Sequence, residues 1–235
     1  MHYDPSSRSR LKSHDLARFP EETLFHRIAR VICEANCLPR KELYESWEVA
    51  RRARRRLRGA RVVDLACGHG LIAQIMMLLD PEIESALLVD RRLPESTAKV
   101  AVALERRWPR LAGRVTRVEG PLDAVVARPG DILVSCHACG ALTDQVLDLA
   151  SAAAVPVAVL PCCQATASGD SGGLGGWLDG ALAIDVTRAA RLRAHGFQVH
   201  TQHLPEALTA KNRLLIGEPP GREPAPALPR RAPPG

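Results

Sequence analysis

Two acidic residues each end an apolar run, and their spacing suits the binding of a nucleoside. The first run, Val62-Val63-Asp64, enters a small-residue turn that finishes at Gly70, and an apolar helical segment follows at once. The second run ends at Asp90, at the spacing of about 20 residues expected for a ribose-binding acid. A buried parallel strand, a glycine-rich turn and a helix form the usual cradle for a nucleotide-like ligand. Asp90 is therefore the candidate ligand of the ribose hydroxyls.

The chemistry of this turn distinguishes between two cofactors. Gly68, Gly70 and Ala73 fit the looser form of the dinucleotide fingerprint, in which the backbone approaches a pyrophosphate. Asp64 stands at the approach to the turn, where a carboxylate repels a pyrophosphate but accepts hydrogen bonds from an ammonium group. The turn therefore favours the cationic amino-acid end of S-adenosylmethionine (SAM) over NAD.

The segment from Asp64 to Gly70, Asp-Leu-Ala-Cys-Gly-His-Gly, resembles the first motif of class I SAM-dependent methyltransferases, D-x-G-x-G-x-G. Ala66 replaces the first glycine, which an alanine can do where the backbone has negative φ. The resemblance implies that the turn holds the methionine end of SAM and that Glu119-Gly120 lies by the adenine. The predicted cofactor contacts are Asp64, Ala66, Cys67, Gly68, Gly70, Asp90, Arg91, Glu119, Gly120 and Ser135.

A second group of reactive side chains follows two later apolar runs, over 131–135 and 155–160. Ligands of open α/β sheets bind outside the carboxyl ends of the strands, so these residues belong beside the cofactor. An imidazole, with an ordinary pKa of about 6.5, suits the removal of a proton from an attacking hydroxyl or amine. The predicted catalytic residues are His137, Cys136 and Asp144.

Two other roles for this group stay open. Cys136, His137, Cys139, Cys162 and Cys163 have side chains that zinc prefers, although adjacent residues rarely ligate one ion; no metal site is predicted. The thiols can instead pack the pocket, and Asp144 can complement the dipole at a helix start.

The same residues resemble one methyltransferase branch, the domain of the Trm13-type tRNA 2′-O-methyltransferases and their uncharacterised relatives. The matching segments are Cys-His-Ala-Cys-Gly-Ala-Leu-Thr-Asp at 136–144, Leu-Pro-Cys-Cys-Gln at 160–164 and Lys-Asn-Arg at 211–213, within residues 40–217. The resemblance implies an RNA acceptor, although the Cys/His-rich zinc module of the eukaryotic tRNA enzymes is absent from this sequence.

A run of arginines over residues 51–58 is the strongest charge feature, in a chain of net charge +6 and pI near 9.2. Such a run is usually a solvated helix face, but it also offers phosphates an electrostatic footprint. With few aromatic side chains for base stacking, RNA binding would depend on backbone charge and be sensitive to salt. The predicted substrate contacts are Arg51, Arg52, Arg54, Arg55, Lys211 and Asn212. The alternatives are a small-molecule or protein methyltransferase, and a SAM- or nucleotide-binding module without catalysis.

The pattern of apolar runs predicts the fold. Strands are expected over 61–66, 84–90, 114–119, 131–136 and 155–160, with helices near 69–79, 94–108, 140–153 and 185–195. This alternation is typical of a mostly parallel sheet with right-handed crossovers. Two further strands, over 197–204 and 212–217, predict a terminal antiparallel hairpin, as in the Rossmann-like class I methyltransferase fold with seven strands.

The chain divides into four predicted segments: a flexible N-terminus (1–18), a helical extension with helices over 20–38 and 41–58 (19–58), the methyltransferase domain (59–217) and a disordered proline-rich tail (218–235). No apolar run approaches the ~20 residues that span a bilayer, and no signal peptide is recognisable. We therefore expect a cytoplasmic protein whose seven cysteines are not in disulfides. The sequence does not indicate its oligomeric state.

Overall fold

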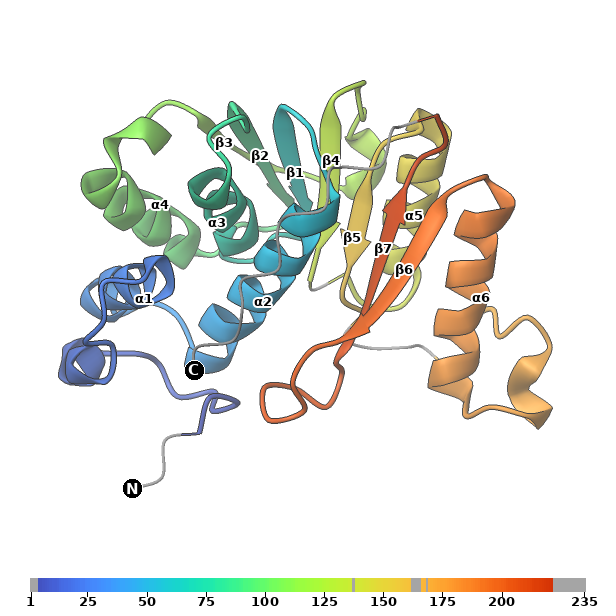
Figure 1. Ribbon diagram of the computed structural model, residues 1–235, viewed down its shortest axis with the longest axis horizontal. Coiled ribbons are helices and arrows are strands. Elements are labelled where there is room, and N and C mark those ends of the chain that lie inside the picture. The colour runs from blue at the N-terminus through green and yellow to red at the C-terminus, as the bar shows by residue number, and fades with distance from the viewer. Residues whose placement is uncertain (1–3, 137, 162–165, 168, 222–235) are drawn as a thin grey trace, which may run out of the picture.

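The sheet has seven strands in the order β3-β2-β1-β4-β5-β7-β6 in the computed structural model, which describes residues 4–136, 138–161, 166–167 and 169–221 (Figure 1). The strands β3, β2, β1, β4 and β5 pair in parallel, whereas β7 is antiparallel to both β5 and β6. This confirms the predicted mostly parallel sheet with a terminal antiparallel hairpin. The strands are β1 (Arg61–Leu65), β2 (Ser85–Asp90), β3 (Val115–Glu119), β4 (Asp131–Ser135), β5 (Val157–Val159), β6 (Gln198–His203) and β7 (Arg213–Glu218).

Helices cover both faces of the sheet, with α1 to α4 on one face and α5 and α6 on the other (Figure 1). The α-helices are α1 (Leu24–Ala35), α2 (Arg40–Arg56), α3 (Leu71–Leu79), α4 (Glu95–Arg107), α5 (Ala141–Ala153) and α6 (Gly180–Ala194). Short 3₁₀ helices occupy η1 (Ser13–Arg18), η2 (Pro109–Leu111), η3 (Leu122–Ala124) and η4 (Leu174–Gly176).

Strand β1 shows why the apolar runs become central strands. Successive side chains of a strand point to opposite faces, and a parallel strand covered on both faces needs apolar residues throughout. Val62 packs among residues of α1 to α3, and Val63 packs with residues of α5 and α6 on the other face. Asp64 interrupts this run while remaining buried, so the chain places a carboxylate at a position that packing alone would fill with an apolar group.

The N-terminal segment is more ordered than the sequence suggests. Residues 4–18 were expected to fray, yet Leu11 is fully buried and Asp15 is 2% exposed. The backbone N–H of Leu11 donates to the carbonyl of Leu38 at 2.9 Å, which ties this segment to the start of α2. Burial of the Leu11 side chain contributes a favourable free energy. This offsets the conformational entropy that the polar, basic segment loses when it becomes ordered.

Element boundaries differ from the prediction most clearly at α6. The helix begins at Gly180, five residues before the predicted start at 185, because the side chain of Asp179 accepts from the N–H of Leu182 at 3.0 Å. The helix predicted over 20–38 is shorter, since Thr23 caps its start and Asn36, with positive φ, ends it. The tail from residue 222 lies outside the described residues.

The parallel strands run in one direction, so the sheet has two distinct ends. We use the term carboxyl edge for the end of the sheet at which the parallel strands finish, and amino edge for the opposite end, at which they begin. The connection between β6 and β7 lies at the carboxyl edge, low in Figure 1. Helix α2 runs from the carboxyl edge to the amino edge, because only residues 57–60 separate its end from the start of β1. Within the described residues, no helix is long and apolar enough to cross a membrane.

Candidate cofactor and acceptor site

The turn between β1 and α3 follows the backbone of β2 closely. Gly70 has φ 66°, and a Cβ at this position would collide with the side chain of Leu88. The N–H of Gly70 donates to the carbonyl of Cys67 at 2.8 Å, which closes the turn. Only glycine combines this positive φ with this close approach, so the predicted cradle is present with its second glycine placed as the motif requires.

Ala66 adopts positive φ. The sequence led us to expect negative φ at this substitution of the first motif glycine, but the residue lies in the left-handed region at φ 52°. This expectation was wrong, because the turn keeps the backbone shape that glycine would allow and the alanine adopts it under strain. Left-handed conformations cost an L-residue roughly 1–2 kcal/mol.

Asp64 is a buried acid whose hydrogen bonding is incomplete. Its side chain is 1% exposed, and neither oxygen has a partner of normal geometry among the described residues. Burial raises the pKa of Asp64 well above its ordinary value, the nearby charge of Asp90 adds to this, and the backbone N–H of Ala73 offsets it in part. A buried acid that stays unsatisfied is costly, and a bound ammonium group would remove that cost.

Asp90 joins the turn to the end of β2. Its Oδ2 accepts from the N–H of Gly68 at 2.9 Å and its Oδ1 accepts from the N–H of Arg92 at 3.3 Å. An ionised carboxylate has about four acceptor positions, so two remain for ribose hydroxyls. Arg91, also a predicted cofactor contact, is exposed beside it.

Glu119 and Gly120 extend this arrangement to the end of β3. The carboxylate of Glu119 accepts from the N–H of Leu93 at 2.9 Å, and the N–H of Gly120 donates to the carbonyl of Asp90 at 2.9 Å. The ends of β2 and β3 are thus held together. Glu119 fixes the chain that follows Asp90, a contact the sequence did not suggest.

Cys67 has no features of a reactive thiol. Its side chain is buried, and burial together with the charges of Asp64 and Asp90 raises its pKa far above the ordinary value. A protonated thiol is a poor nucleophile and a poor metal ligand. Its place inside the turn fits the role of a small filler.

The loop between β4 and α5 is described except at His137. Ser135 is buried, its Oγ accepts from the N–H of Ala138 at 3.3 Å, and Thr143 donates to the carbonyl of Ala138 at 2.6 Å. Cys136 is buried and Cys139 is exposed. The three remaining residues of the possible zinc set, His137, Cys162 and Cys163, lie outside the described residues. The catalytic assignment of His137 therefore stays a prediction.

Asp144 is engaged by a buried arginine. Arg188 of α6 is 2% exposed and binds both carboxylate oxygens of Asp144, at 3.0 and 2.8 Å. It also donates to the carbonyl of Gly140 at 2.9 Å and to Asp185 at 3.3 Å. Burial lowers the pKa of Arg188, but the bonds and charges of Asp144 and Asp185 outweigh this and raise it overall. Asp144 thus holds the turn at Gly140 in place.

Comparison with known proteins identifies the family. A family model described as a methyltransferase domain matches residues 41–169, more than half of the chain. The chain belongs to this methyltransferase-domain family. The match begins inside the segment predicted to be a separate helical extension, so α2 falls within the matched region. No curated protein matches the chain.

Solved structures share the methyltransferase fold. A putative O-methyltransferase from Nostoc punctiforme PCC 73102 is 16% identical, with a TM-score of 0.51 over 87% of this chain and 67% of that one. An O-methyltransferase family protein from Burkholderia thailandensis is 18% identical, with a TM-score of 0.49 over 91% of this chain. A tRNA methyltransferase of B. subtilis is 13% identical, with a TM-score of 0.48 over 74% of this chain. The chain spans 65% of the length of each of the last two.

The turn fits SAM, the methyl donor of these enzymes. The orphaned carboxylate of Asp64 suits the ammonium group, and Asp90 faces the same turn from β2. Because Gly70 has no Cβ, the side chain of Leu88 from β2 packs directly against the turn. The residues present are therefore those that a SAM-dependent methyltransferase needs.

The arginines predicted to bind substrate do not gather at this site. Arg51 and Arg52 both pair with Glu48, each at 2.9 Å, and Arg52 also donates to Gln202 at 2.9 Å. Arg54 pairs with Asp80, which precedes β2 at the amino edge. Of this predicted set on α2, Arg55 alone is exposed. Helix α2 therefore positions these arginines away from the turn between β1 and α3, which we call the cofactor turn.

The two other predicted substrate contacts do lie at the carboxyl edge. Lys211 is exposed in the connection between β6 and β7. Asn212 donates from Nδ2 to the carbonyl of Leu204 at 3.0 Å, and its own carbonyl accepts from the N–H of Leu204 at 2.8 Å. Asn212 therefore closes the base of the hairpin connection, and the exposed Lys211 lies next to this closure.

His69 is a site residue that sequence reasoning missed. Its Nε2 lies 2.6 Å from the carboxylate of Glu42 and its Nδ1 lies 2.5 Å from the hydroxyl of Ser96. These partners are 27 residues away on either side in sequence. No local pattern indicates the contact; only the fold brings α2 and α4 to the turn.

Proposed function

We propose that this SAM-dependent methyltransferase acts on RNA, which it binds across the carboxyl edge of its sheet. The exposed basic residues of this edge support the proposal, because phosphate contacts dominate RNA affinity. Five of them form no ion pair within the described part of the chain: Arg8, Arg10, Arg91, Arg92 and Lys211. The branch resemblance to Trm13-type tRNA methyltransferases supports the same acceptor class.

The distribution of charge between the two edges carries this proposal. Three guanidinium groups on α2 are engaged in ion pairs: Arg51 and Arg52 share the carboxylate of Glu48, and Arg54 pairs with Asp80. The charges at the carboxyl edge stand where an acceptor must approach the methyl group. The charge that matters for RNA is thus at this edge and not in the arginine run.

The reaction itself asks little chemistry of the protein. SAM, when bound, supplies a methyl group on a sulfonium, and the acceptor must align with it. In the proposed complex, Asp64 and the backbone of Gly68 and Gly70 orient the methionine end, and Asp90 binds the ribose. A hydroxyl acceptor must also lose its proton, and His137 is our proposed base. In that role, His137→Ala lowers kcat while SAM affinity stays unchanged; unchanged turnover would exclude it.

A pair of matched charge reversals tests the acceptor. Arg92→Glu/Lys211→Glu changes two residues at the carboxyl edge, and Arg55→Glu/Arg56→Glu makes the same change in charge at the amino end of the sheet. We expect the first variant to lose about tenfold or more in RNA methylation, and its binding slope against log salt to fall by about two.

The control variant is expected to keep most of its RNA methylation and SAM affinity. A larger loss in Arg55→Glu/Arg56→Glu than in the carboxyl-edge variant would return RNA binding to the arginine run. If the wild-type enzyme, shown to bind SAM, methylates no cellular RNA, the RNA acceptor is excluded.

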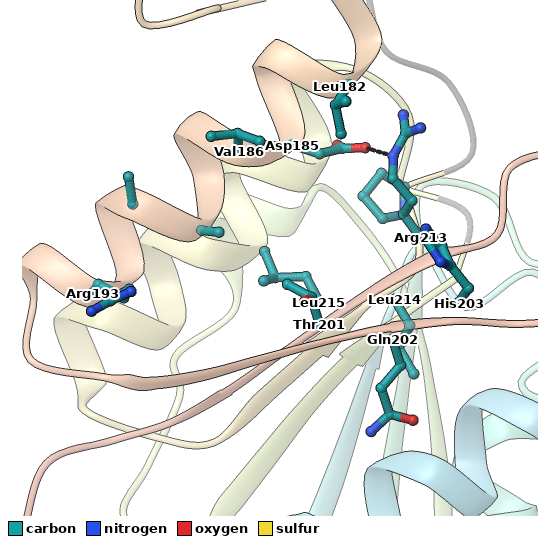
Figure 2. A pocket seen from close by; sticks show the side chains of 13 residues that line it. Leu182, Asp185, Val186, Arg193, Thr201, Gln202, His203, Arg213, Leu214 and Leu215 are labelled. Carbon is teal, nitrogen blue, oxygen red and sulfur yellow. Dashed lines mark hydrogen bonds and ion pairs between the residues drawn. The ribbon is translucent and has the colours of Figure 1, made fainter. Parts of the chain in front are cut away.

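A cavity supports a second candidate, a small apolar acceptor. The cavity of 510 Å³ lies between α6 and the hairpin of β6 and β7, within the ~300–1,000 Å³ typical of ligand sites (Figure 2). Leu182, Val186 and Leu215 form apolar wall, and the ion pair of Asp185 with Arg213, at 2.7 Å, stands at one end.

The cavity also has access to the reaction site. Pro161, at the end of β5, lines it. Two strand spacings, about 10 Å, separate the end of β4 from the start of β7, so an acceptor larger than this could reach from the cavity to the methyl group. Ala189→Trp, which fills the cavity without touching the ion pair, should abolish methylation of such an acceptor and leave RNA methylation intact. Loss of RNA methylation in Ala189→Trp, with methylation of the small acceptor intact, would instead favour RNA binding in the cavity.

A further inference from the structure

His69 connects the cofactor turn to two helices that lie outside the turn itself. Its Nε2 is 2.6 Å from Glu42 Oε2 at the start of α2, and its Nδ1 is 2.5 Å from Ser96 Oγ in the first turn of α4. The side chains of His69 and Glu42 are 20% and 27% exposed, so the pair is partly shielded from water. Both ring nitrogens are therefore used, and neither partner belongs to the sheet.

The turn has little rigidity of its own. Gly68 and Gly70 both have positive φ, and glycine is the residue that loses most conformational freedom when it is fixed. The other anchors of the turn come from β2, α3 and α4. The N–H of Cys67 donates to the carbonyl of Val89 at 3.1 Å, and the N–H of Gly68 donates to Asp90. Thr97 and Gln74 donate to the carbonyls of Gly68 and Gly70, at 2.8 and 2.9 Å. Among the described residues, His69 is the only side chain of the turn that forms a hydrogen bond or ion pair with a side chain of α2.

The chemistry of the contact suits a positioning role. In the neutral ring, Nε2–H donates to the carboxylate of Glu42 and Nδ1 accepts from the hydroxyl of Ser96. A hydrogen bond to a charged group contributes more than a neutral one. Glu42 also fixes which nitrogen carries the proton, and thereby how Ser96 and the ring are oriented.

We propose that Glu42 and Ser96 act through His69 as positioning residues that hold the turn in the shape that binds the methionine end of SAM. Helix α2 is then part of the cofactor site, although its sequence precedes the first motif. The family match agrees with this arrangement, since it begins at residue 41 and includes Glu42.

Binding of S-adenosylhomocysteine and of adenosine separates a local effect on the methionine end from a general one. In Glu42→Gln and in Ser96→Ala we expect the Kd for S-adenosylhomocysteine, measured by calorimetry, to rise about fivefold to tenfold. The Kd for adenosine, which lacks the methionine end, should stay within about twofold, given the error of such comparisons. Equal weakening of both ligands would contradict the proposal.

Glu48→Gln is the matched control. Glu48 lies on the same helix and pairs with Arg51 and Arg52, without a described contact to the turn. Glu48→Gln removes the same charge as Glu42→Gln. The thermal midpoint of this control therefore measures how the loss of an α2 ion pair affects stability when the turn is not contacted. We expect similar midpoints in Glu42→Gln and Glu48→Gln, with weaker S-adenosylhomocysteine binding only in the former.

A double-mutant cycle decides whether Glu42 acts through His69. In a His69→Ala background, Glu42→Gln should change the Kd for S-adenosylhomocysteine by less than about twofold, because the connection is already broken. Additive weakening in that background would show that Glu42 acts independently of His69. Unchanged affinity in all three single variants would exclude a positioning role for this group.

Discussion

Two charged side chains are buried to nearly the same extent in the two halves of this molecule, and their surroundings are opposite. Asp64, at the end of β1, is 1% exposed and has no hydrogen-bond partner among the described residues. Arg188, on α6, is 2% exposed and binds Asp144, Asp185 and the carbonyl of Gly140. One buried charge is unsatisfied and the other is fully engaged.

The difference separates a ligand site from a scaffold. Burying an unpaired charge is costly, so a fold keeps one only where something else compensates it. Around Asp64, we propose that the ammonium group of SAM is the compensating partner. Around Arg188, the protein supplies its own partners, and the network only fixes the turn after β4. The half with β1 and β2 is therefore incomplete without a ligand, whereas the packing of α5 on α6 is complete in itself.

Arg188→Met should have the largest effect on stability. The change leaves Asp144 and Asp185 without their buried partner, and breaking a buried pair costs about 3–5 kcal/mol. We expect the free energy of unfolding in urea to fall by that amount. Arg191→Met is the control, since Arg191 is 39% exposed and a surface pair contributes under about 1 kcal/mol. Equal losses in both variants would mean that burial does not distinguish the two arginines.

Asp64→Asn should stabilise the protein without ligand, whereas Arg188→Met should destabilise it. Without the carboxylate, the ammonium end of SAM loses a charge-assisted partner worth about 1.5–3 kcal/mol, a rise in Kd of roughly tenfold to 100-fold. The protein without ligand should become more stable above neutral pH, because a neutral amide replaces a buried charge. Calorimetric SAM binding and urea unfolding at pH 8 measure both. Lower stability together with unchanged SAM affinity would remove Asp64 from the cofactor site.

The pH dependence of SAM binding gives a third contrast. The pKa of Asp64 is raised above its ordinary value of 3.8, so the folded protein holds this proton more tightly than the unfolded chain. The stabilisation that the protonated Asp64 contributes is complete below pH 3.8 and is lost as the pH rises through the raised pKa. An ammonium ligand needs the ionised form, so SAM affinity should increase with pH by up to about tenfold per unit over this window. If SAM affinity no longer depends on pH in Asp64→Asn, the wild-type pH dependence is assigned to Asp64. If the wild-type affinity itself does not depend on pH, the proposed contact of Asp64 with the ammonium group is contradicted.

Local patterns were sufficient to predict the sheet and the cofactor turn. Val62 and Val63 before Asp64, and the apolar run that ends at Asp90, each indicate a buried strand and its ligand-facing end within a few residues. The hairpin followed from two short strands late in the chain. These features depend on residues that are neighbours in sequence, so periodicity and turn chemistry reveal them.

The rest of the site depends on contacts between distant segments. Arg188 lies 44 residues from Asp144, and nothing in the sequence of α6 distinguishes it from Arg191 or Arg193. The pairing of Arg51 and Arg52 with Glu48, just before the arginine run, reduces the charge that the composition suggested. A count of arginines cannot report which of them the fold neutralises.

Backbone strain gives the smallest contrast. Ala66 in the cofactor turn and Ala154 at the end of α5 are both left-handed, with φ of 52° and 48°. Glycine relieves about 1 kcal/mol of strain at either position, reduced by the entropy that glycine adds to the unfolded chain. We expect Ala66→Gly and Ala154→Gly each to raise the thermal midpoint by a few degrees. The two changes should add, because the sites share no contact. A gain at Ala154 with a loss at Ala66 would show that the methyl group of Ala66 makes packing contacts in the turn that outweigh its strain.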